Sequence, residues 1–473
     1  MSSVHNVRRI VSVVACTFVA LACGTNYAYS AWAPQFAERM KLSATQTNLI
    51  GAAANLGMYG SGFPLGLLTD THGPRLTSLI GAFSLGIGYY PIYKAYVNGE
   101  GFLGTFLLSF FAFLSGLGGC SAFSAAIKVA ASNFPSHRGT ATAFPLAAFG
   151  LSAFFWSTLS AIAFKDDTAQ FLLLLTIGTF TLTLLSVPFL RIFPSPESYH
   201  TLSHYPSDGD RTESRRLRPA GSSEFQTIHD ASEEADIRGL AMLWKPQFWQ
   251  LFAMMALLSG LGLMTINNIG NSAKALWKYY DDSVTPKFIQ QQQVMHVSIL
   301  SIGNFSGRLL SGIGSDILVQ KLHMSRFWCL LISAVVFTLT QLAGSSISNP
   351  HTLVLVSGFT GVAYGFLFGV FPSLTAQTFG IGGLSQNWGV MILAPVLSGN
   401  IFNLIYGHIY DAHSVITPEG SRDCPDGLQC YQTAYYTTMV SGMAGIVVCI
   451  WSIYKDNQAH GHFQKKVEHD RLA

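Results

Sequence analysis

The sequence has few charged residues. Asp, Glu, Lys and Arg make up 11% of its 473 residues, whereas a soluble globular domain carries about 25%. Much of the protein surface is therefore expected to face lipid rather than water. The formal net charge is only +3, and no basic stripe with interleaved aromatic residues occurs outside one loop. We therefore expect no nucleic-acid partner.

The chain also lacks the motifs that mark catalytic and cofactor sites. It has no glycine-rich phosphate loop, no spacing typical of a catalytic triad, and no CxxC or histidine-rich pattern that would hold a metal. An ATP-driven pump needs a soluble nucleotide-binding domain, and the longest loop is too short and too polar to form one. We therefore predict neither an enzyme nor a protein with a cofactor or a metal.

The sequence does contain long intervals without charged residues. A helix needs about 20 mostly apolar residues to cross a bilayer, and nine intervals between charged residues are long enough for one span each. A further interval of 84 residues, 327–410, has no Asp, Glu, Lys or Arg and suits three spans. The sequence thus predicts an all-α membrane protein with twelve transmembrane helices in two six-helix halves. The predicted spans are roughly 10–32, 45–69, 76–96, 101–130, 139–164, 168–190, 246–270, 288–311, 326–345, 351–374, 385–409 and 433–455.

Lys and Arg are distributed unevenly between the two sides of the predicted bundle. With the N-terminus in the cytoplasm, 19 of the 27 Lys and Arg residues fall on the cytoplasmic side, as the positive-inside rule expects. Both termini are therefore expected in the cytoplasm. We predict an N-terminal half (1–190), a mostly disordered cytoplasmic linker (191–245), a C-terminal half (246–455) and a cytoplasmic tail (456–473). The linker is too polar to bury the apolar area that would order it.

Two of the seven cysteines share one loop. Cys424 and Cys430 lie in the segment CPDGLQC before the last predicted span, where Pro and Gly suit a tight turn. An oxidising outer or luminal side would permit a disulfide there. Two free thiols are the alternative.

A related motif occurs at equivalent places in the two halves. It reads Gly66-Leu-Leu-Thr-Asp70-Thr-His-Gly73-Pro-Arg75 after the second predicted span, and Gly307-Arg308-Leu-Leu-Ser-Gly312-Ile-Gly314-Ser-Asp316 after the eighth. The first copy resembles the signature loop of the major facilitator superfamily, although the Arg that usually follows the acid is Thr71 here.

The resemblance implies two pseudo-symmetric six-helix halves that rock about a central substrate site. We expect charge pairs among four residues to latch the cytoplasmic side and to break as the halves move. A purely structural role for the two acids is the alternative. The predicted gating residues are Asp70, Arg75, Arg308 and Asp316.

A narrower resemblance is to the nodulin-like branch of this superfamily and to its fungal monocarboxylate-transporter homologues. It implies a monocarboxylate-like cargo and a vacuolar or plasma membrane. In one departure, Asn55 stands where plant members often have an acid before Leu-Gly. The resemblance rests on Gly24-Thr-Asn26-Tyr27-Ala-Tyr29-Ser, Gln46-Thr-Asn48-Leu-Ile-Gly51, Asn133-Phe-Pro135, Arg138-Gly139-Thr140, Ile266-Asn267-Asn268-Ile-Gly270, Asn387-Trp388-Gly389, Asn403, Tyr410-Asp411, Cys424 and Cys430-Tyr431.

Polar residues within the predicted spans are candidate substrate contacts. Strongly polar groups are costly in hydrocarbon, so they face the interior of the bundle or a water-filled path. Interhelical hydrogen bonds are the alternative for the asparagines. The candidates are Asn26 and Tyr27 on span one, Asn267 and Asn268 on span seven, and Asn400 and Asn403 on span eleven.

Titratable residues within the spans are few. Every acidic residue lies in a loop or at a span end, so no carboxylate in the membrane could carry a proton. His296 in span eight is a candidate proton relay, with packing as its alternative. Lys128 in span four either faces the path or extends to the headgroups. Together with Arg308, Lys128 favours a small organic anion as the substrate.

We therefore predict a secondary active or facilitative transporter that works by alternating access in a lipid bilayer. Its expected cargo is a small organic anion such as a monocarboxylate, and coupling to protons would run through His296. Two alternatives stay open: a carrier of neutral solutes, and a non-transporting membrane sensor or assembly factor built on the same scaffold.

Overall fold

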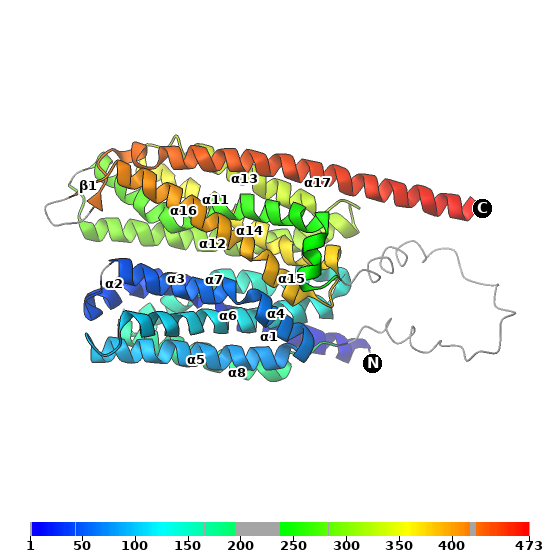
Figure 1. The fold of residues 1–473 in the computed structure, drawn as a ribbon, viewed down its shortest axis with the longest axis horizontal. Coiled ribbons are helices and arrows are strands. Elements are labelled where there is room, and N and C mark those ends of the chain that lie inside the picture. Colours follow the sequence, from blue (N-terminus) through cyan, green and yellow to red (C-terminus); the bar gives the residue numbers. More distant parts are fainter. Residues whose placement is uncertain are drawn as a thin grey trace.

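The computed structural model describes residues 2–42, 44–164, 167–193, 237–281, 283–416 and 422–472. Most of these residues are helical, and the helices run side by side in one elongated bundle (Figure 1). The N- and C-termini lie at the same end of the bundle, which we call the terminal end. The predicted disordered linker falls, for residues 194–236, outside the described residues.

The first half contains six membrane-spanning units, two of which are interrupted. The first unit changes to a 3₁₀ turn at its middle, and the second breaks at Ser61. The units are α1 (Ser2–Cys23) with η1 (Gly24–Ala28) and α2 (Tyr29–Met40), α3 (Ala44–Gly60) with α4 (Gly62–His72), α5 (Pro74–Asn98), α6 (Thr105–Asn133), α7 (Arg138–Phe164) and α8 (Thr168–Ser186).

The second half has the same number of units in the part of the chain that the structure describes. A short segment, η4 (Gly239–Trp244), precedes them. The units are α11 (Pro246–Tyr280), α12 (Pro286–Gln320), α13 (Phe327–Gly344), α14 (Leu353–Phe379), α15 (Leu384–Met391) with α16 (Leu393–Ala412), and α17 (Gln432–Leu472). Each predicted span coincides with one of these units, which confirms the predicted all-α membrane fold.

Length and composition alone mark nine of these units, among the described residues, as able to cross a membrane. The other three have identifiable reasons to fall short. The α3–α4 unit is divided into two short helices, α5 is rich in Gly and Tyr, and α12 begins with four glutamines, 290–293. All three lie within the bundle beside the apolar units, so they complete the fold through packing.

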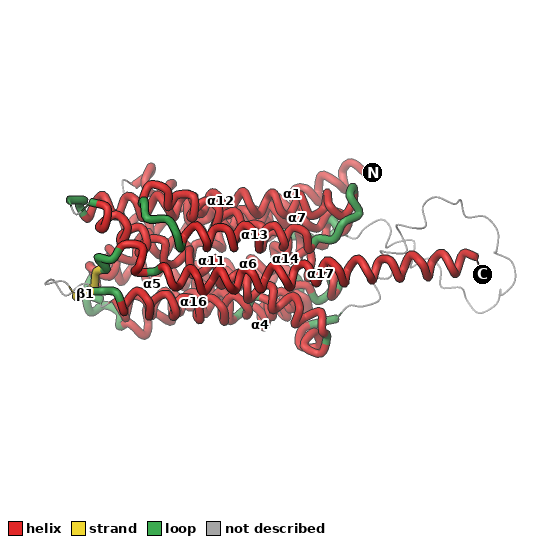
Figure 2. Tube along the Cα trace, turned by 90° about the horizontal axis from the view of Figure 1, so that it is seen from above, coloured by secondary structure: helices red, strands yellow, loops and turns green. Residues whose placement is uncertain are grey.

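The last helix extends past the predicted span 433–455. Residues 456–473 were expected to form a cytoplasmic tail, and α17 continues into them as far as Leu472. Figure 2 shows this helix projecting beyond the rest of the bundle at the terminal end. Charged residues do not interrupt a helix once it has left the hydrocarbon, since its backbone hydrogen bonds are made within the segment.

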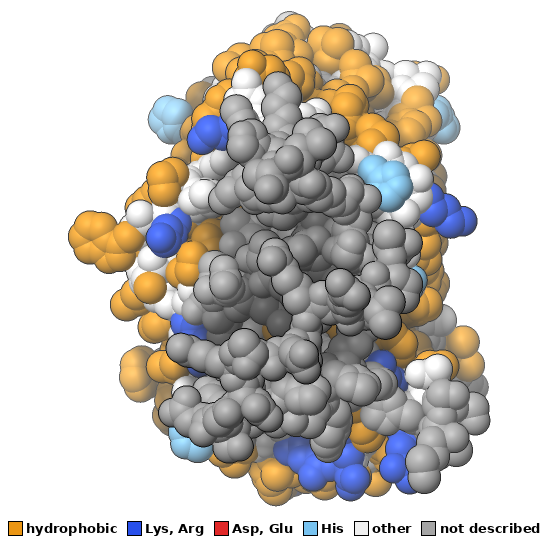
Figure 3. Space-filling model, turned by 90° about the vertical axis from the view of Figure 1, so that its right-hand side faces the viewer, with side chains coloured by type: hydrophobic (Ala, Val, Ile, Leu, Met, Phe, Trp, Pro, Cys, Tyr) orange, Lys and Arg blue, Asp and Glu red, His pale blue; other side chains and the backbone are white. Residues whose placement is uncertain are grey.

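The two halves meet along two pairs of helices related by the internal symmetry. Helix α4 of the first half packs on α15 of the second, and α12 of the second packs on α7 of the first. The outer flanks expose large apolar side chains, including Phe106, Ile162 and Leu404. On the terminal end, the charged side chains that are visible among the described residues are Lys and Arg (Figure 3).

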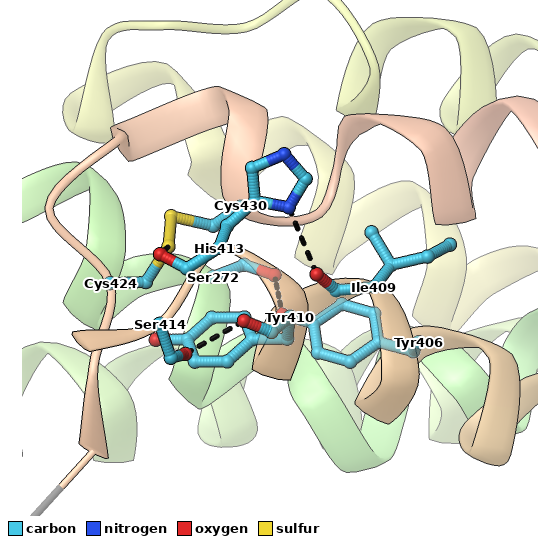
Figure 4. The surroundings of a disulfide bond; sticks show 8 residues. All are labelled: Ser272, Tyr406, Ile409, Tyr410, His413, Ser414, Cys424 and Cys430. Atoms are coloured by element: carbon cyan, nitrogen blue, oxygen red, sulfur yellow. Dashed lines mark hydrogen bonds between the residues drawn. A yellow bond between two sulfur atoms is a disulfide. The ribbon is translucent and has the colours of Figure 1, made fainter. Parts of the chain in front are cut away.

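A disulfide closes the loop before α17 at the end opposite the termini. It joins Cys424, which follows the short strand β2 (Arg422–Asp423), to Cys430 at the end of η6 (Gly427–Cys430). Beneath it, the Tyr406 hydroxyl shares a 2.9 Å hydrogen bond with Ser272 (Figure 4). β2 pairs with the strand β1 (Val415–Ile416) that follows α16. The loop therefore links the ends of α16 and α17 and covers the end of α11.

Replacing both cysteines (Cys424→Ser with Cys430→Ser) should destabilise the protein by about 2 kcal/mol, because the unfolded chain regains the freedom of a short closed loop. Thermal unfolding of the purified protein in detergent measures this loss. Reducing agent should lower the wild-type transition to that of the variant and leave the variant unchanged. Equal transitions for oxidised wild type and variant would show that the bridge contributes no stability.

Candidate functional site

A small cavity lies between the two halves, near the middle of the helices. Its volume is about 30 Å³, which is room for about one water molecule. Arg308 is the one charged residue among those that line it. The lining includes Tyr27, Tyr59, Phe123, Ser124, Leu146 and Phe149 from the first half, and Arg308, Phe368, Trp388 and Ile392 from the second.

The guanidinium of Arg308 is buried, with 2% of the residue exposed. Its Nε donates to Asn304 Oδ1 at 2.8 Å, one turn earlier on α12. Its Nη1 donates to the carbonyl oxygen of Leu146 on α7, also at 2.8 Å. The rings of Phe149 and Phe368 lie 5.7 and 5.5 Å from it, one from each half. Within the described chain, no carboxylate forms an ion pair with this cation.

Two phenol groups complete the polar part of the cavity. The hydroxyls of Tyr27 and Tyr59 are 3.0 Å apart and hydrogen-bonded, and both lie near the guanidinium. Tyr27 sits in η1, where the chain leaves α-helical geometry, and its ring packs edge-on against Phe149. The cavity therefore offers one cation and three hydroxyls, those of Tyr27, Tyr59 and Ser124, within otherwise apolar walls.

Asp70 lies on the terminal side of the cavity and bonds to a helix of the second half. Its carboxylate, 2% exposed, accepts hydrogen bonds from the backbone N–H groups of Ser385 (3.3 Å) and Gln386 (2.9 Å) at the start of α15. Lys128 lies 3.1 Å from the same carboxylate and donates to the carbonyls of Ile381 and Gly382. A carboxylate is favourable at a helix N-terminus, where N–H groups lack partners.

Asp316, in the second half, forms the equivalent contact with a helix of the first half. It accepts from the backbone N–H groups of Gly139 (3.2 Å) and Thr140 (2.6 Å) at the start of α7, and it pairs with Arg326 at 2.8 Å. We call the contacts of Asp70 and Asp316 with these two helices the paired caps. Each cap joins the two halves of the protein.

A glycine one turn before each acid lets the helices approach. A Cβ at Gly66 would collide with the carbonyl oxygen of Ser385, and a Cβ at Gly312 would collide with Ala143 and crowd the carbonyl oxygen of Gly139. The spacing of four residues from glycine to acid is the same in both halves. The repeated motif therefore positions the two acids at equivalent places in the two halves.

The predicted cations of this region are placed differently. Arg75 is exposed and donates to the carbonyl of Pro188, and Arg308 lies in the cavity instead of pairing with an acid. The cations that accompany the acids are Lys128, expected at the substrate, and Arg326, which the sequence reasoning missed. Arg326 directly precedes α13, after the turn that follows α12, so its closeness to Asp316 depends on tertiary structure.

Most of the polar candidates of the spans form hydrogen bonds within one half. Asn26 donates to the Ala54 carbonyl at 3.2 Å, and Asn268 donates to Asn403 Oδ1 at 2.7 Å. These are the interhelical bonds that were the alternative interpretation. Asn267 is exposed, as is Asn400, whose side chain donates to its own helix. None of these asparagines lines the central cavity, whereas Tyr27 does.

His296 lies between two helices of the second half, apart from the cavity lining. Its Nδ1 is 2.8 Å from Ser357 Oγ on α14, and its Nε2 has no hydrogen-bond partner. The residue is fully buried. His296 thus contacts a helix of its own half and does not reach the cavity.

The C-terminal end of the linker packs against α15. The fully buried side chain of Asn387 accepts from the Gly239 N–H at 2.7 Å and donates to the Ile237 carbonyl at 2.8 Å. The N–H of Ile237 donates to the carbonyl of Phe379 at the end of α14. Gly239 also lies against Phe63 of α4. The segment therefore contacts both halves beside the cap formed by Asp70.

Comparisons with known proteins agree with this architecture. A family model described as Major Facilitator Superfamily matches residues 14–380. The chain is 27% identical to "Uncharacterized membrane protein YMR155W" of Saccharomyces cerevisiae, with 93% of each chain covered. It is 24% identical to "Probable transporter MCH1" of Gibberella zeae, with 94% of this chain and 89% of that one covered.

Two solved structures share the fold. One is the major facilitator superfamily transporter FucP in the outward conformation, with a TM-score of 0.55, 14% identity, and coverage of 93% of this chain and 99% of that one. The other is the proton:xylose symporter XylE, with a TM-score of 0.62, 12% identity, and coverage of 95% and 96%. At these identities the likeness establishes the fold alone.

Removing the charge of either acid should loosen the helix that it caps. We expect Asp70→Asn to speed amide hydrogen exchange in 384–391, and Asp316→Asn to speed it in 138–145. A charge-assisted bond lost from a helix N-terminus costs about 1–3 kcal/mol, which corresponds to roughly 5- to 150-fold faster exchange. Hydrogen-exchange mass spectrometry measures both segments in each variant, so each variant is the control for the other. Unchanged exchange in both segments would contradict the assigned caps.

Proposed function

The chain belongs to the major facilitator superfamily and is a multi-pass membrane carrier, not an enzyme, and we propose that it moves a small organic anion by alternating access. Cargo would bind in the central cavity, between the halves. The observation that carries this proposal is the buried charge of Arg308, which no carboxylate of the described chain neutralises.

A guanidinium keeps its charge at physiological pH, and removing an ion from water costs several kcal/mol. The neutral oxygens around the guanidinium, those of Asn304, the Leu146 carbonyl and Tyr27, offset this cost only in part. An anion in the cavity would neutralise the charge. A carrier of neutral solutes would have no comparable use for an unpaired cation. Arg308 therefore replaces Lys128 as the proposed cation for the substrate.

The contacts between the halves suggest which state the structure represents. Hydrogen bonds that join the two halves lie at Arg308 and nearer to the terminal end. We propose that this end is cytoplasmic, since Lys and Arg gather there (Figure 3). The structure would then be closed to the cytoplasm by the paired caps, and transport would require both caps to open.

The proposal also extends to the kind of cargo, the membrane and the coupling. A monocarboxylate cargo and a vacuolar or plasma membrane follow from the resemblance to the nodulin-like branch and its fungal homologues. Coupling to protons would have to use a residue other than an acid of the cavity, because the lining contains none. His296 is a weak candidate for that role, since it packs against Ser357 within one half.

Uptake of labelled organic acids into proteoliposomes tests the proposal. We expect saturable uptake of a monocarboxylate by wild type, and a roughly 30-fold or greater loss of kcat/KM in Arg308→Gln, because losing one partner of a buried charged contact costs about 2–5 kcal/mol. Arg308→Lys should retain part of the activity. Lys321→Gln, at an exposed cation beyond the end of the same helix, is the matched control and should transport normally.

The same experiment separates the alternatives. If the rate of uptake does not change with an imposed proton gradient, transport is not coupled to protons. Stabilisation of the folded protein by an acid that never enters the liposome would favour a membrane sensor or assembly factor. If no acid binds or enters although the protein is folded, the anion assignment fails and a neutral solute becomes the better candidate.

A further inference from the structure

We propose that the ligand of the central cavity is an amphipathic monoanion, with one carboxylate for Arg308 and a flat apolar body about the size of one aromatic ring. This inference rests on the proposed function and narrows its substrate class. It follows from three features of the cavity: the number of charges, the number of hydroxyls, and the arrangement of aromatic side chains on its walls.

The cavity can neutralise one negative charge. The nearest comparable cation on the neighbouring wall is Lys128, one turn beyond Ser124 on α6. Its ammonium group already contacts the Asp70 carboxylate and two backbone carbonyls. A second carboxylate on the ligand would lose its water and find no cation in exchange, which is strongly unfavourable. Dicarboxylates should therefore bind poorly.

Few neutral polar groups are available to a ligand. The lining supplies the hydroxyls of Tyr27, Tyr59 and Ser124, and the two phenols are bonded to each other. A sugar or polyol leaves several hydroxyls unsatisfied in such a site, because each buried hydroxyl needs a partner. The cavity is thus a poor match for the polyhydroxylated ligands of the sugar symporters that share its fold.

Each half contributes one aromatic pair to the walls. In the first half, Phe123 and Phe149 lie 4.4 Å apart between ring centroids. In the second, Phe368 and Trp388 meet edge to face at 6.4 Å. Arg308 lies between Phe149 and Phe368, so the two pairs flank the cation from opposite halves.

A planar apolar body suits the space between these pairs. Rings stack or meet edge to face with favourable energy beyond the area that they bury, and the nearby Met58 sulfur also favours an aromatic neighbour. At about 30 Å³ the cavity is too small for a ring. Binding therefore requires the two aromatic pairs to move apart, and the bound ring would then touch both halves.

Thermal stabilisation of the purified full chain by a panel of small molecules tests the ligand class without requiring transport. The probes are benzoate, isovalerate, acetate, gluconate, succinate and the neutral benzamide. We expect benzoate to bind at least tenfold more tightly than acetate, with isovalerate between them. Gluconate, succinate and benzamide should not bind at concentrations where benzoate saturates. Succinate or gluconate binding as tightly as benzoate would overturn the inference.

Substitution of Phe368 tests the role of the aromatic walls. Phe368→Leu keeps an apolar side chain but removes the ring, and should weaken benzoate roughly three- to tenfold more than it weakens acetate. Phe359→Leu is the control, since that ring lies on the same helix and is exposed on the outer surface. An equal loss for benzoate and acetate would show that Phe368 acts only through the fold.

The outcomes distinguish this inference from the proposed function. If benzoate, acetate and succinate bind alike and Arg308→Gln abolishes all three, the anion site stands and the aromatic specificity is wrong. If none of the acids stabilises the folded protein, the anion site itself is wrong.

Discussion

In the closed state that we propose for this structure, carboxylates at helix N-termini hold the two halves together. The start of a helix presents N–H groups that have no partner within the helix. Asp70 supplies acceptors to the start of α15, and Asp316 does the same for α7. Each acid also holds a cation, so neither charge is left unpaired in a largely apolar bundle. Because each cap joins one half to the other, opening this end must break both.

The fold could be predicted because lipid imposes a simple rule on sequence. Charged residues interrupt a span at high cost, so the charge-free intervals mark the helices nearly one by one. The equivalence of Asp70 and Asp316 could also be predicted, because a motif with the same glycine-to-acid spacing recurs in both halves. The ends of the helices were less predictable: α17 continues beyond the predicted span 433–455 to Leu472, because a helix can extend through charged residues once they lie outside the apolar interval.

The candidate site was predicted only in part. A sequence gives the position of a residue along its helix, but not which residues of other helices lie beside it. Arg308 and Asp316 are eight residues apart on α12, which separates them by about 12 Å along its axis. They cannot form one charge pair, and each meets a different part of the other half. Lys128 was recognised as a cation near the end of its span, yet its partners come from the turn between α14 and α15. The pairs Asn268–Asn403 and Arg326–Asp316 likewise join segments that sequence alone does not bring together.

The cavity and the paired caps share the same helices. Ligand binding in the cavity is therefore linked to the free energy of opening the caps. Helix α12 carries Arg308 in the cavity and Asp316 at the cap. Helix α15 begins at the Asp70 cap and places Trp388 in the cavity lining one turn later. The guanidinium of Arg308 also bonds the Leu146 carbonyl on α7, the helix that Asp316 caps. An anion that recruits Nη1 would compete with that carbonyl and so weaken the contact between α7 and α12. Because that contact helps to hold the halves together, occupation of the cavity would alter the cost of opening the terminal end without any relay through distant residues.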